Sequence, residues 1–233
     1  MERKRDRPAM SPLDSPALDS PALRAKLAGK RADIRADLLL IADMIEPDSR
    51  VLDVGCGDGT LLDYLAHFKQ VTGRGIELSQ EGVNACVSHG LSVIQGDADR
   101  DLRDYPDGTF DYVVLSRTLQ ATQNPREVLD NLVRIGTRAI VSFPNFGYWR
   151  IRRDLLLQGR MPVNGSLPDR WWETPNIHLC TIRDFVEHCS EVGIVVERAL
   201  TIGADHRARP IGSLRSANLL GQDGVFLLRR EKP

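Results

Sequence analysis

The sequence has little of the chemistry that marks metal-binding, extracellular or membrane-spanning proteins. Its four cysteines, Cys56, Cys86, Cys180 and Cys189, include no C-x-x-C pair, which argues against a zinc site and against a disulfide framework. No hydrophobic run approaches the ~18 residues of a membrane-spanning helix, and the basic N-terminus is not followed by the apolar segment of a signal peptide. These absences predict a cytoplasmic protein with no metal and no membrane partner.

The chain also lacks a strong net charge. Its 31 Lys and Arg residues nearly balance 32 Asp and Glu residues, so the formal net charge is −1 and the sequence pI is about 6.5. A protein whose main role is binding nucleic acid or an anionic membrane is usually basic. We therefore expect no nucleic-acid partner. A length of 233 residues fits one α/β domain with additional segments.

Residues 1–25 differ in composition from the rest of the chain. They repeat a Ser-Pro unit at 11–12, 15–16 and 20–21 and contain little to bury. Because proline every few residues blocks both helices and strand ladders, we expect this tail to be disordered. The remaining residues, 26–233, are expected to form one folded domain.

The most informative stretch is a glycine-rich turn between a predicted strand and a predicted helix. Residues 51–54 form a short apolar run typical of a strand buried on both faces. Gly55, Gly57 and Gly59 follow, and the helix begins at Thr60. Backbone without Cβ atoms can adopt positive φ and lie against a ligand. In an open α/β sheet, this first turn is where a nucleotide-like ligand binds.

The residues around the turn indicate which nucleotide it suits. A dinucleotide fingerprint is G-x-G-x-x-G, and here the third glycine comes one residue early. The stretch also contains two acids, Asp53 and Asp58, and no basic residue, although a pyrophosphate prefers a helix N-terminus without carboxylates. A ligand with a cationic end fits better, and S-adenosylmethionine carries a sulfonium and an ammonium. Dinucleotide binding and a plain tight turn are the alternatives.

Predicted strands and helices alternate along the domain. Strands are expected at 51–54, 71–78, 92–95, 110–116, 139–143, 194–197 and 225–228, and helices at 31–45, 60–68, 79–90, 125–135 and 182–192. Asn124 before Pro125, and Thr181 before the last helix, are expected to be N-caps. This alternation predicts a Rossmann-like, doubly wound, mainly parallel seven-stranded sheet.

The glycine turn resembles motif I of the class I S-adenosylmethionine-dependent methyltransferases. This resemblance implies that the cofactor is contacted by Asp53, Gly55, Cys56, Gly57, Gly59, Glu77, Leu78, Asp97, Ala98 and Ser116. Glu77 ends the second strand about twenty residues past the turn, where a carboxylate can accept the ribose hydroxyls, or it is a surface acid. The resemblance places Asp97 at the adenine amino group and the Ala98 backbone against the ring; Asp97 could instead cap a helix.

A generic domain of this kind has no need for residues 144–180. All three tryptophans, Trp149, Trp171 and Trp172, lie there among arginines such as Arg150. At the carboxyl end of the fifth strand, such an insertion could be a lid over a methyl acceptor. Aromatic residues with arginine are also typical of protein interfaces. Alternatively the insertion has its own small core, filled by Trp171 and Trp172.

Four motifs together resemble the MetW family of methionine biosynthesis proteins. They are LSRTLQ at 115–120, SFPNFG at 142–147, GRMPV at 159–163 and TPNIHLCT at 174–181. The resemblance covers about 31–197, with departures at Arg117, where Gln is expected, and at Asp169-Arg170, where an aromatic residue is usual. It implies a methyltransferase-like domain that binds S-adenosylmethionine or S-adenosylhomocysteine. It also implies a partner, a MetX-like homoserine O-acyltransferase.

Two hypotheses follow. In the first, the chain is a cofactor-binding partner subunit of the acyltransferase, and 144–180 is the interface. In the second, it is an S-adenosylmethionine-dependent small-molecule methyltransferase, and 144–180 closes over an acceptor. His178 is the one candidate catalytic base, with a structural hydrogen bond as the alternative. The residues after the fourth strand contain no acid or Asn-Pro-Pro-Tyr pattern that would orient an amine.

Overall fold

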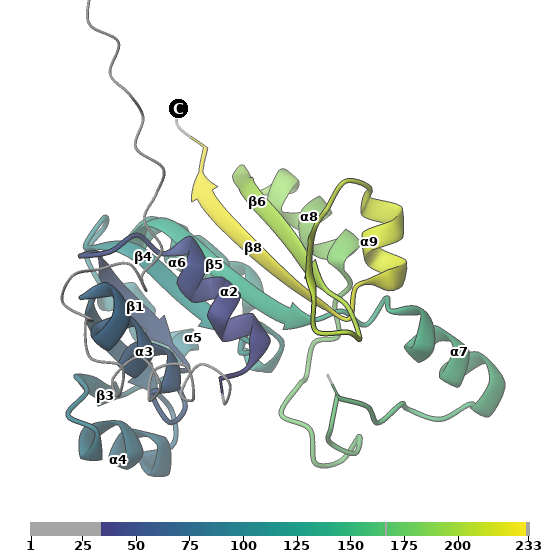
Figure 1. The fold of residues 1–233 in the computed structure, drawn as a ribbon, viewed down its shortest axis with the longest axis horizontal. Helices are drawn as coiled ribbons and strands as arrows, with labels where there is room; N and C mark the ends of the chain where they lie inside the picture. Colours follow the sequence, from purple (N-terminus) through teal and green to yellow (C-terminus); the bar gives the residue numbers. More distant parts are fainter. Residues whose placement is uncertain (1–33, 166, 232–233) are drawn as a thin grey trace, which may run out of the picture. The chain divides into compact units, whose positions relative to one another are not determined.

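A mixed β-sheet organises the fold. In the computed structural model, which describes residues 34–165 and 167–231, it has eight strands in the order β3-β2-β1-β4-β5-β8-β6-β7 (Figure 1). The strands are β1 (Arg50–Val54), β2 (Thr72–Glu77), β3 (Val93–Gln95), β4 (Phe110–Ser116), β5 (Gly136–Pro144), β6 (Ile194–Ile202), β7 (Ala208–Pro210) and β8 (Asp223–Arg230). Strands β1 to β5 pair in parallel, whereas β8 runs antiparallel between β5 and β6.

The predicted α/β sheet is therefore confirmed, with one strand more than the predicted seven. The addition is β7, which pairs with β6 at the edge of the sheet. Its three residues are all exposed, so no burial pattern in the sequence could reveal it. The predicted disordered tail at 1–25 lies outside the described residues.

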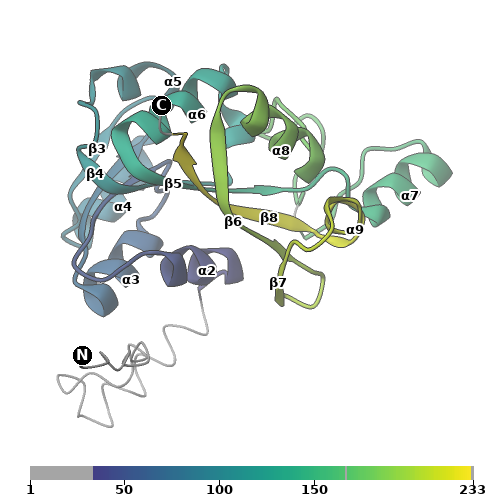
Figure 2. The ribbon, with the colours of Figure 1, turned by 90° about the horizontal axis from the view of Figure 1, so that it is seen from above.

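Helices cover both faces of the sheet. Figure 2 shows α2 (Ala36–Met44) and α3 (Thr60–Lys69) on one face, and α5 (Ala98–Asp101), α6 (Pro125–Ile135) and α8 (Ile182–Glu191) on the other. Helix α4 (Gln80–Ser88) packs against β2 and β3. Three helices were not among those predicted, namely α5, α7 (Trp149–Gln158) and α9 (Leu214–Leu220). None of the helices in the described ranges is long and apolar enough to cross a bilayer.

The predicted caps had different outcomes. Thr181 forms a capping box with Asp184, as expected: each side chain accepts a hydrogen bond from the backbone N–H of the other. Asn124 is the N-cap residue of α6, as predicted, but its side chain makes no capping hydrogen bond. The carboxylate of Asp99 instead accepts from the N–H groups of Gln123 and Asn124, each at 2.8 Å. Asp99, from another element, therefore anchors the backbone that leads into α6.

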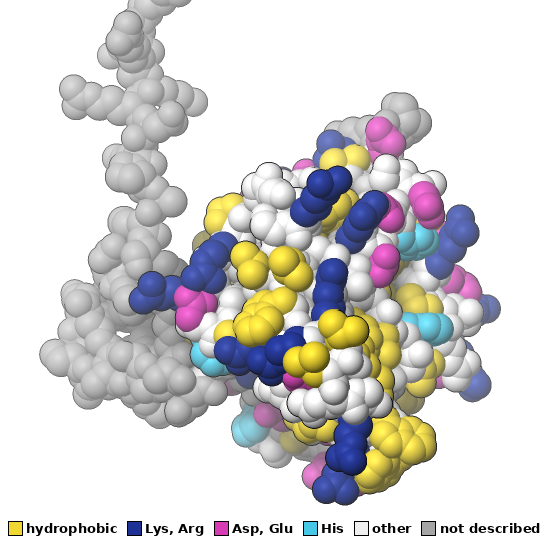
Figure 3. All heavy atoms as spheres, turned by 90° about the vertical axis from the view of Figure 1, so that its right-hand side faces the viewer, with side chains coloured by type: hydrophobic (Ala, Val, Ile, Leu, Met, Phe, Trp, Pro, Cys, Tyr) yellow, Lys and Arg dark blue, Asp and Glu magenta, His cyan; other side chains and the backbone are white. Residues whose placement is uncertain are grey.

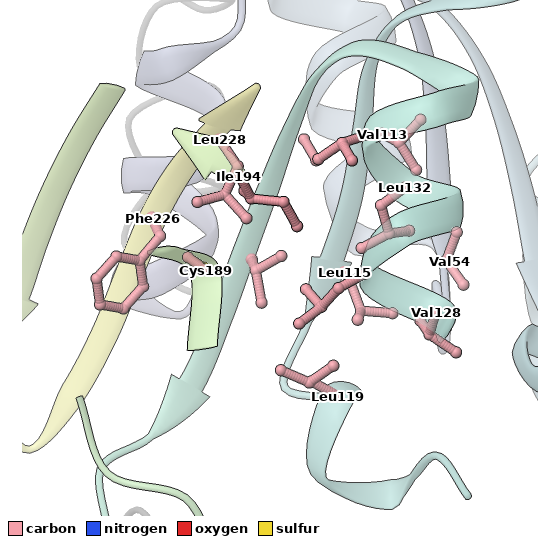
Figure 4. Packing of buried hydrophobic residues seen from close by; sticks show 14 of the residues in the cluster. Val54, Val113, Leu115, Leu119, Val128, Leu132, Cys189, Ile194, Phe226 and Leu228 are labelled. Carbon is pink, nitrogen blue, oxygen red and sulfur yellow. The ribbon is translucent and has the colours of Figure 1, made fainter. Parts of the chain in front are cut away.

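The main core lies between the sheet and the helices α6 and α8. Figure 4 shows α6 side chains, including Val128 and Leu132, facing the residues of β4. At the β5 and β8 side of the cluster, the ring of Phe143 stacks on Phe226, with centroids 5.5 Å apart, and tilts against Phe185 at 4.8 Å. Such ring pairs stabilise beyond their buried area. These three rings join the parallel part of the sheet to its antiparallel edge.

Removal of the central ring should therefore be costly. Phe143 is fully buried, so Phe143→Ala leaves a cavity and should lower the free energy of unfolding by about 3–5 kcal/mol. Urea denaturation followed by circular dichroism measures this. Leu156→Ala is the control, because Leu156 is 84% exposed and its loss should change stability by less than about 0.5 kcal/mol. Equal stability of the two variants would contradict this account of the core.

Candidate cofactor-binding site

A cleft of about 340 Å³ lies at the carboxyl ends of the central parallel strands. It is lined by Gly55, Ile76, Glu77, Leu78, Gly96, Asp97, Ala98, Asp99, Arg117, Thr118, Ala121, Thr122, Gln123 and Pro175. The strand order reverses between β1 and β4, and ligands of open α/β sheets bind at such a switch point. The volume falls in the range of small-molecule sites.

The glycine turn shapes one wall of this cleft. Gly55 has a φ of +70°, and a Cβ there would lie 2.5 Å from Oγ1 of Thr118. Gly59, the N-cap residue of α3, has a φ of +81°, and a Cβ there would collide with Leu91. A side chain at either position would be strained and would also clash. Glycine at these positions therefore lets the turn approach both its neighbours and a ligand closely.

Glu77 lines the cleft, and its carboxylate holds the turn. Its Oε2 atom accepts a hydrogen bond from the N–H of Gly57 at 2.8 Å, and its Oε1 atom accepts one from the N–H of Ser79 at 2.9 Å. An ionised carboxylate has about four acceptor sites, so two remain for ligand hydroxyls. The carboxylate is therefore fixed in place at the end of β2 before any ligand arrives.

Asp97 caps a helix, which was the alternative interpretation of this residue. It is the N-cap of α5, and its side chain accepts from the N–H of Asp99 at 2.9 Å. Asp97 and Ala98 also line the cleft. The cap fixes the carboxyl group at the cleft wall, so the predicted adenine contact is compatible with it and stays a prediction.

Of the predicted contact residues, Glu77, Leu78, Asp97, Ala98 and Gly55 line the cleft. The others, Asp53, Cys56, Gly57, Gly59 and Ser116, neighbour the lining in sequence but are not among the described residues that form it. Burial raises the pKa of the Cys56 thiol, whose Sγ lies 3.9 Å from that of Cys86. No group of three or more His, Cys, Asp or Glu in the described ranges could hold a metal ion.

Sequence reasoning missed several lining residues, of which Arg117 is the most unusual. It has a φ of +55°, a conformation that non-glycine residues seldom adopt away from functional sites. Its Nη2 atom donates to Oδ1 of Asp223 at 3.0 Å, and its Nε atom lies 3.4 Å from Oδ2 of Asp37. Both acids are buried. In the sequence, the only indication that Arg117 is unusual was its departure from the family motif.

The cleft is acidic. Its described lining has three carboxylates, Glu77, Asp97 and Asp99, and one cation, Arg117, which is already paired with two further acids. The resulting potential favours a ligand with a positive end over an anionic one. This agrees with the charge argument made from the turn alone.

The insertion at 144–180 lies mostly away from the cleft. Pro175 is its one contribution to the described lining. Trp171 and Trp172 are 69% and 57% exposed, so the expectation that they fill a small core is wrong. Trp149 is also exposed and, with Arg150, begins α7. The described lining of the cleft contains no aromatic residue that would support the acceptor-lid hypothesis.

His178 does not line the cleft in the described part of the chain. It lies in a separate apolar groove beside Cys180, between the η4 turn (Leu119–Ala121) and α8. Its backbone N–H donates to the carbonyl of Gln120 at 3.0 Å, and its Nε2 atom is 3.3 Å from the carbonyl of Gln123. These contacts support the structural alternative.

Asp99 offers a test of how the cleft loop is held. Asp99→Ala removes both hydrogen bonds to the N–H groups of Gln123 and Asn124, so we expect unfolding to become about 1–3 kcal/mol easier. Amide hydrogen exchange at those two residues should also become faster. Asp104→Ala, at an exposed carboxyl of the same connection, is the control. Unchanged exchange at Gln123 and Asn124 would show that other contacts hold this loop.

Comparison with known families and proteins identifies one matching family and a related bifunctional protein. Residues 35–228 match the family described as methionine biosynthesis protein MetW. The bifunctional methionine biosynthesis protein MetXA/MetW of Rhodopirellula baltica is 34% identical over 200 residues, which cover 82% of this chain and 32% of that relative. The chain therefore spans about a third of the length of this curated relative.

Solved structures show the same fold. A possible histamine N-methyltransferase of Thermotoga maritima, described as S-adenosylmethionine-dependent, has a TM-score of 0.62 at 13% identity, covering 89% of this chain and 94% of its own. An S-adenosylmethionine-dependent methyltransferase of Archaeoglobus fulgidus has a TM-score of 0.60 at 17% identity, covering 90% and 98%. These likenesses establish a methyltransferase fold. The chain belongs to the MetW family of methionine biosynthesis proteins.

Proposed function

We propose that this chain binds S-adenosylmethionine in its acidic cleft and acts in methionine biosynthesis as a partner or activating subunit of homoserine O-acyltransferase. The proposal that the chain binds this ligand depends on the position of Glu77. The N–H groups of Gly57 and Ser79 fix its carboxylate, which keeps acceptor sites for a ligand. The proposal that the chain has an acyltransferase partner rests on its membership of the MetW family and on one fused relative.

The cleft fits S-adenosylmethionine in three respects. Glu77 is placed to accept the two ribose hydroxyls, which are hydrogen-bond donors. Asp97 and Ala98 line the same cleft, where the adenine would lie. The excess of carboxylates suits the sulfonium and ammonium groups. When bound, the cofactor would supply an electrophilic methyl group, and this chain's residues would orient it and limit its contact with water.

The partner proposal has support from outside the cleft. The name of the Rhodopirellula baltica relative joins MetXA and MetW in one chain, and the present chain covers 32% of it. In that relative the two proteins named are parts of one polypeptide. Where such proteins are separate chains, they often bind each other. The resemblance to MetW identifies the partner expected here as a homoserine O-acyltransferase.

The alternative, a small-molecule methyltransferase, needs an acceptor held beside the sulfonium. Methyl transfer depends mainly on positioning, with a base where the acceptor must lose a proton. The described lining of the cleft contains no histidine, and Arg117 is tied to Asp37 and Asp223. These observations favour the subunit role. Steady release of S-adenosylhomocysteine with the complete set of pathway substrates would favour the alternative.

Calorimetric titration tests the ligand. The wild-type chain should bind S-adenosylmethionine and S-adenosylhomocysteine and should not bind NAD. Glu77→Gln should weaken both by about 1.5–3 kcal/mol, the loss expected for a hydrogen bond to a charged group, which is roughly 10- to 150-fold. Glu81→Gln is the matched control, because Glu81 is exposed on α4. If the two variants bound S-adenosylmethionine equally well, Glu77 would not be a ligand contact.

Reconstitution tests the partner. Adding the purified chain to homoserine O-acyltransferase from the same organism should raise the acyltransferase rate, and the two proteins should elute together from a sizing column. The measurement is acyl transfer to homoserine with and without this chain. If the rate and the elution volumes stay those of the separate proteins, the subunit role is wrong, whatever the chain binds in its cleft.

A further inference from the structure

Residues 149–165 and 167–173, here called the arm, extend beyond the sheet. Figures 1 and 2 both show α7 projecting past the strands, with the following segment looping back. Within α7 only Ile151 is buried, whereas Leu156 and Leu157 are 84% and 74% exposed. An amphipathic helix normally buries one apolar face. The exposed leucines of α7 therefore belong to a surface without a partner in the described part of this chain.

The rest of the arm also exposes apolar side chains. Met161, Val163, Trp171 and Trp172 line a groove together with Gly159, Arg160 and Arg170. The two tryptophan rings meet edge to face with centroids 5.4 Å apart. Exposed apolar patches of this kind mark interaction sites, and tryptophan is enriched among the residues that dominate binding energy.

Arginines border the apolar surface. The guanidinium of Arg170 lies 5.3 Å from the ring centre of Trp172, and those of Arg150 and Arg153 lie 5.5 and 5.3 Å from that of Trp149. Arg153 pairs with Asp154. Among the described residues, Arg150, Arg160 and Arg170 take part in no ion pair. Figure 3 shows dark blue side chains interleaved with yellow ones on this side of the molecule.

We propose that the arm is the surface that docks the acyltransferase, and that the acyltransferase presents there an apolar patch bordered by carboxylates. This inference rests on the proposed function, because it deepens the partner half of it. Arginine held against an aromatic ring is pre-oriented, so it can form paired hydrogen bonds with a carboxylate at little entropic cost. The tryptophans and leucines supply the apolar area, and the arginines select the partner's charge.

Other occupants fit the arm less well. A two-fold contact between two copies would bring the same arginines together, and like charges across an interface are costly. Nucleic acid would meet three acids in the arm, Asp154, Asp169 and Glu173, in a chain whose net charge is −1. A protein surface with both apolar and acidic groups matches every feature of the arm.

Binding of purified acyltransferase by the full-length chain, followed by biolayer interferometry, tests the proposal. Two double variants address the two kinds of contact: Trp171→Ala with Trp172→Ala, and Arg160→Glu with Arg170→Glu. All four side chains are exposed, so folding should be unaffected, and circular dichroism checks this. Each double variant should bind the acyltransferase at least tenfold more weakly and keep wild-type affinity for S-adenosylmethionine.

Matched controls lie on other elements. Val87→Ala replaces an exposed apolar residue of α4, and Arg198→Glu reverses an exposed charge on β6; both should bind the acyltransferase like the wild type. If the arm variants also bind like the wild type, the docking surface is elsewhere and this inference is overturned while the subunit role stands. If the wild type itself does not bind, both fail. A dimer that only the arm variants disrupt would assign the arm to a second copy instead.

Discussion

The geometry of the cleft depends on one carboxylate, that of Glu77. By accepting the N–H groups of Gly57 and Ser79, it fixes the glycine turn after β1 to the end of β2 and to the start of α4. Without it, two backbone donors beside the cleft would lose their partner, and such losses are costly where water cannot replace them. The same carboxylate retains acceptor sites toward the cleft. One side chain thus links the geometry of the turn to the proposed ribose site.

The cleft and the arm are joined by a short stretch of backbone. Pro175, which follows the arm, lines the cleft, and the N–H groups of Ile177 and His178 both donate to the carbonyl of Gln120, at 2.8 and 3.0 Å. The residues just after Gln120 line the cleft as well. The segment that follows the arm is therefore hydrogen-bonded to backbone that directly precedes lining residues of the cleft.

Much of this was readable in the sequence, and the limits have physical causes. The buried run 51–54, the glycines after it and the Thr181 capping box all depend on local pattern, and the structure has them where expected. Local pattern cannot reveal that Asp99, from another element, holds the backbone before α6 while the side chain of Asn124 makes no capping hydrogen bond. Nor does it show that Trp171 and Trp172 are exposed, because tryptophan fills cores and interfaces equally well. The contacts of Arg117 with Asp37 and Asp223 join residues far apart in sequence.

The central claim is that S-adenosylmethionine lies in the cleft with its ribose on Glu77. A crystal structure of the chain grown with S-adenosylmethionine tests it most directly. The account predicts both ribose hydroxyls within hydrogen-bond distance of the Glu77 carboxylate, the adenine between Leu78 and Ala98, and the Gly57 and Ser79 hydrogen bonds still in place. A ligand bound elsewhere on the chain, or a ribose that contacts other groups while Glu77 faces only the backbone, would contradict it.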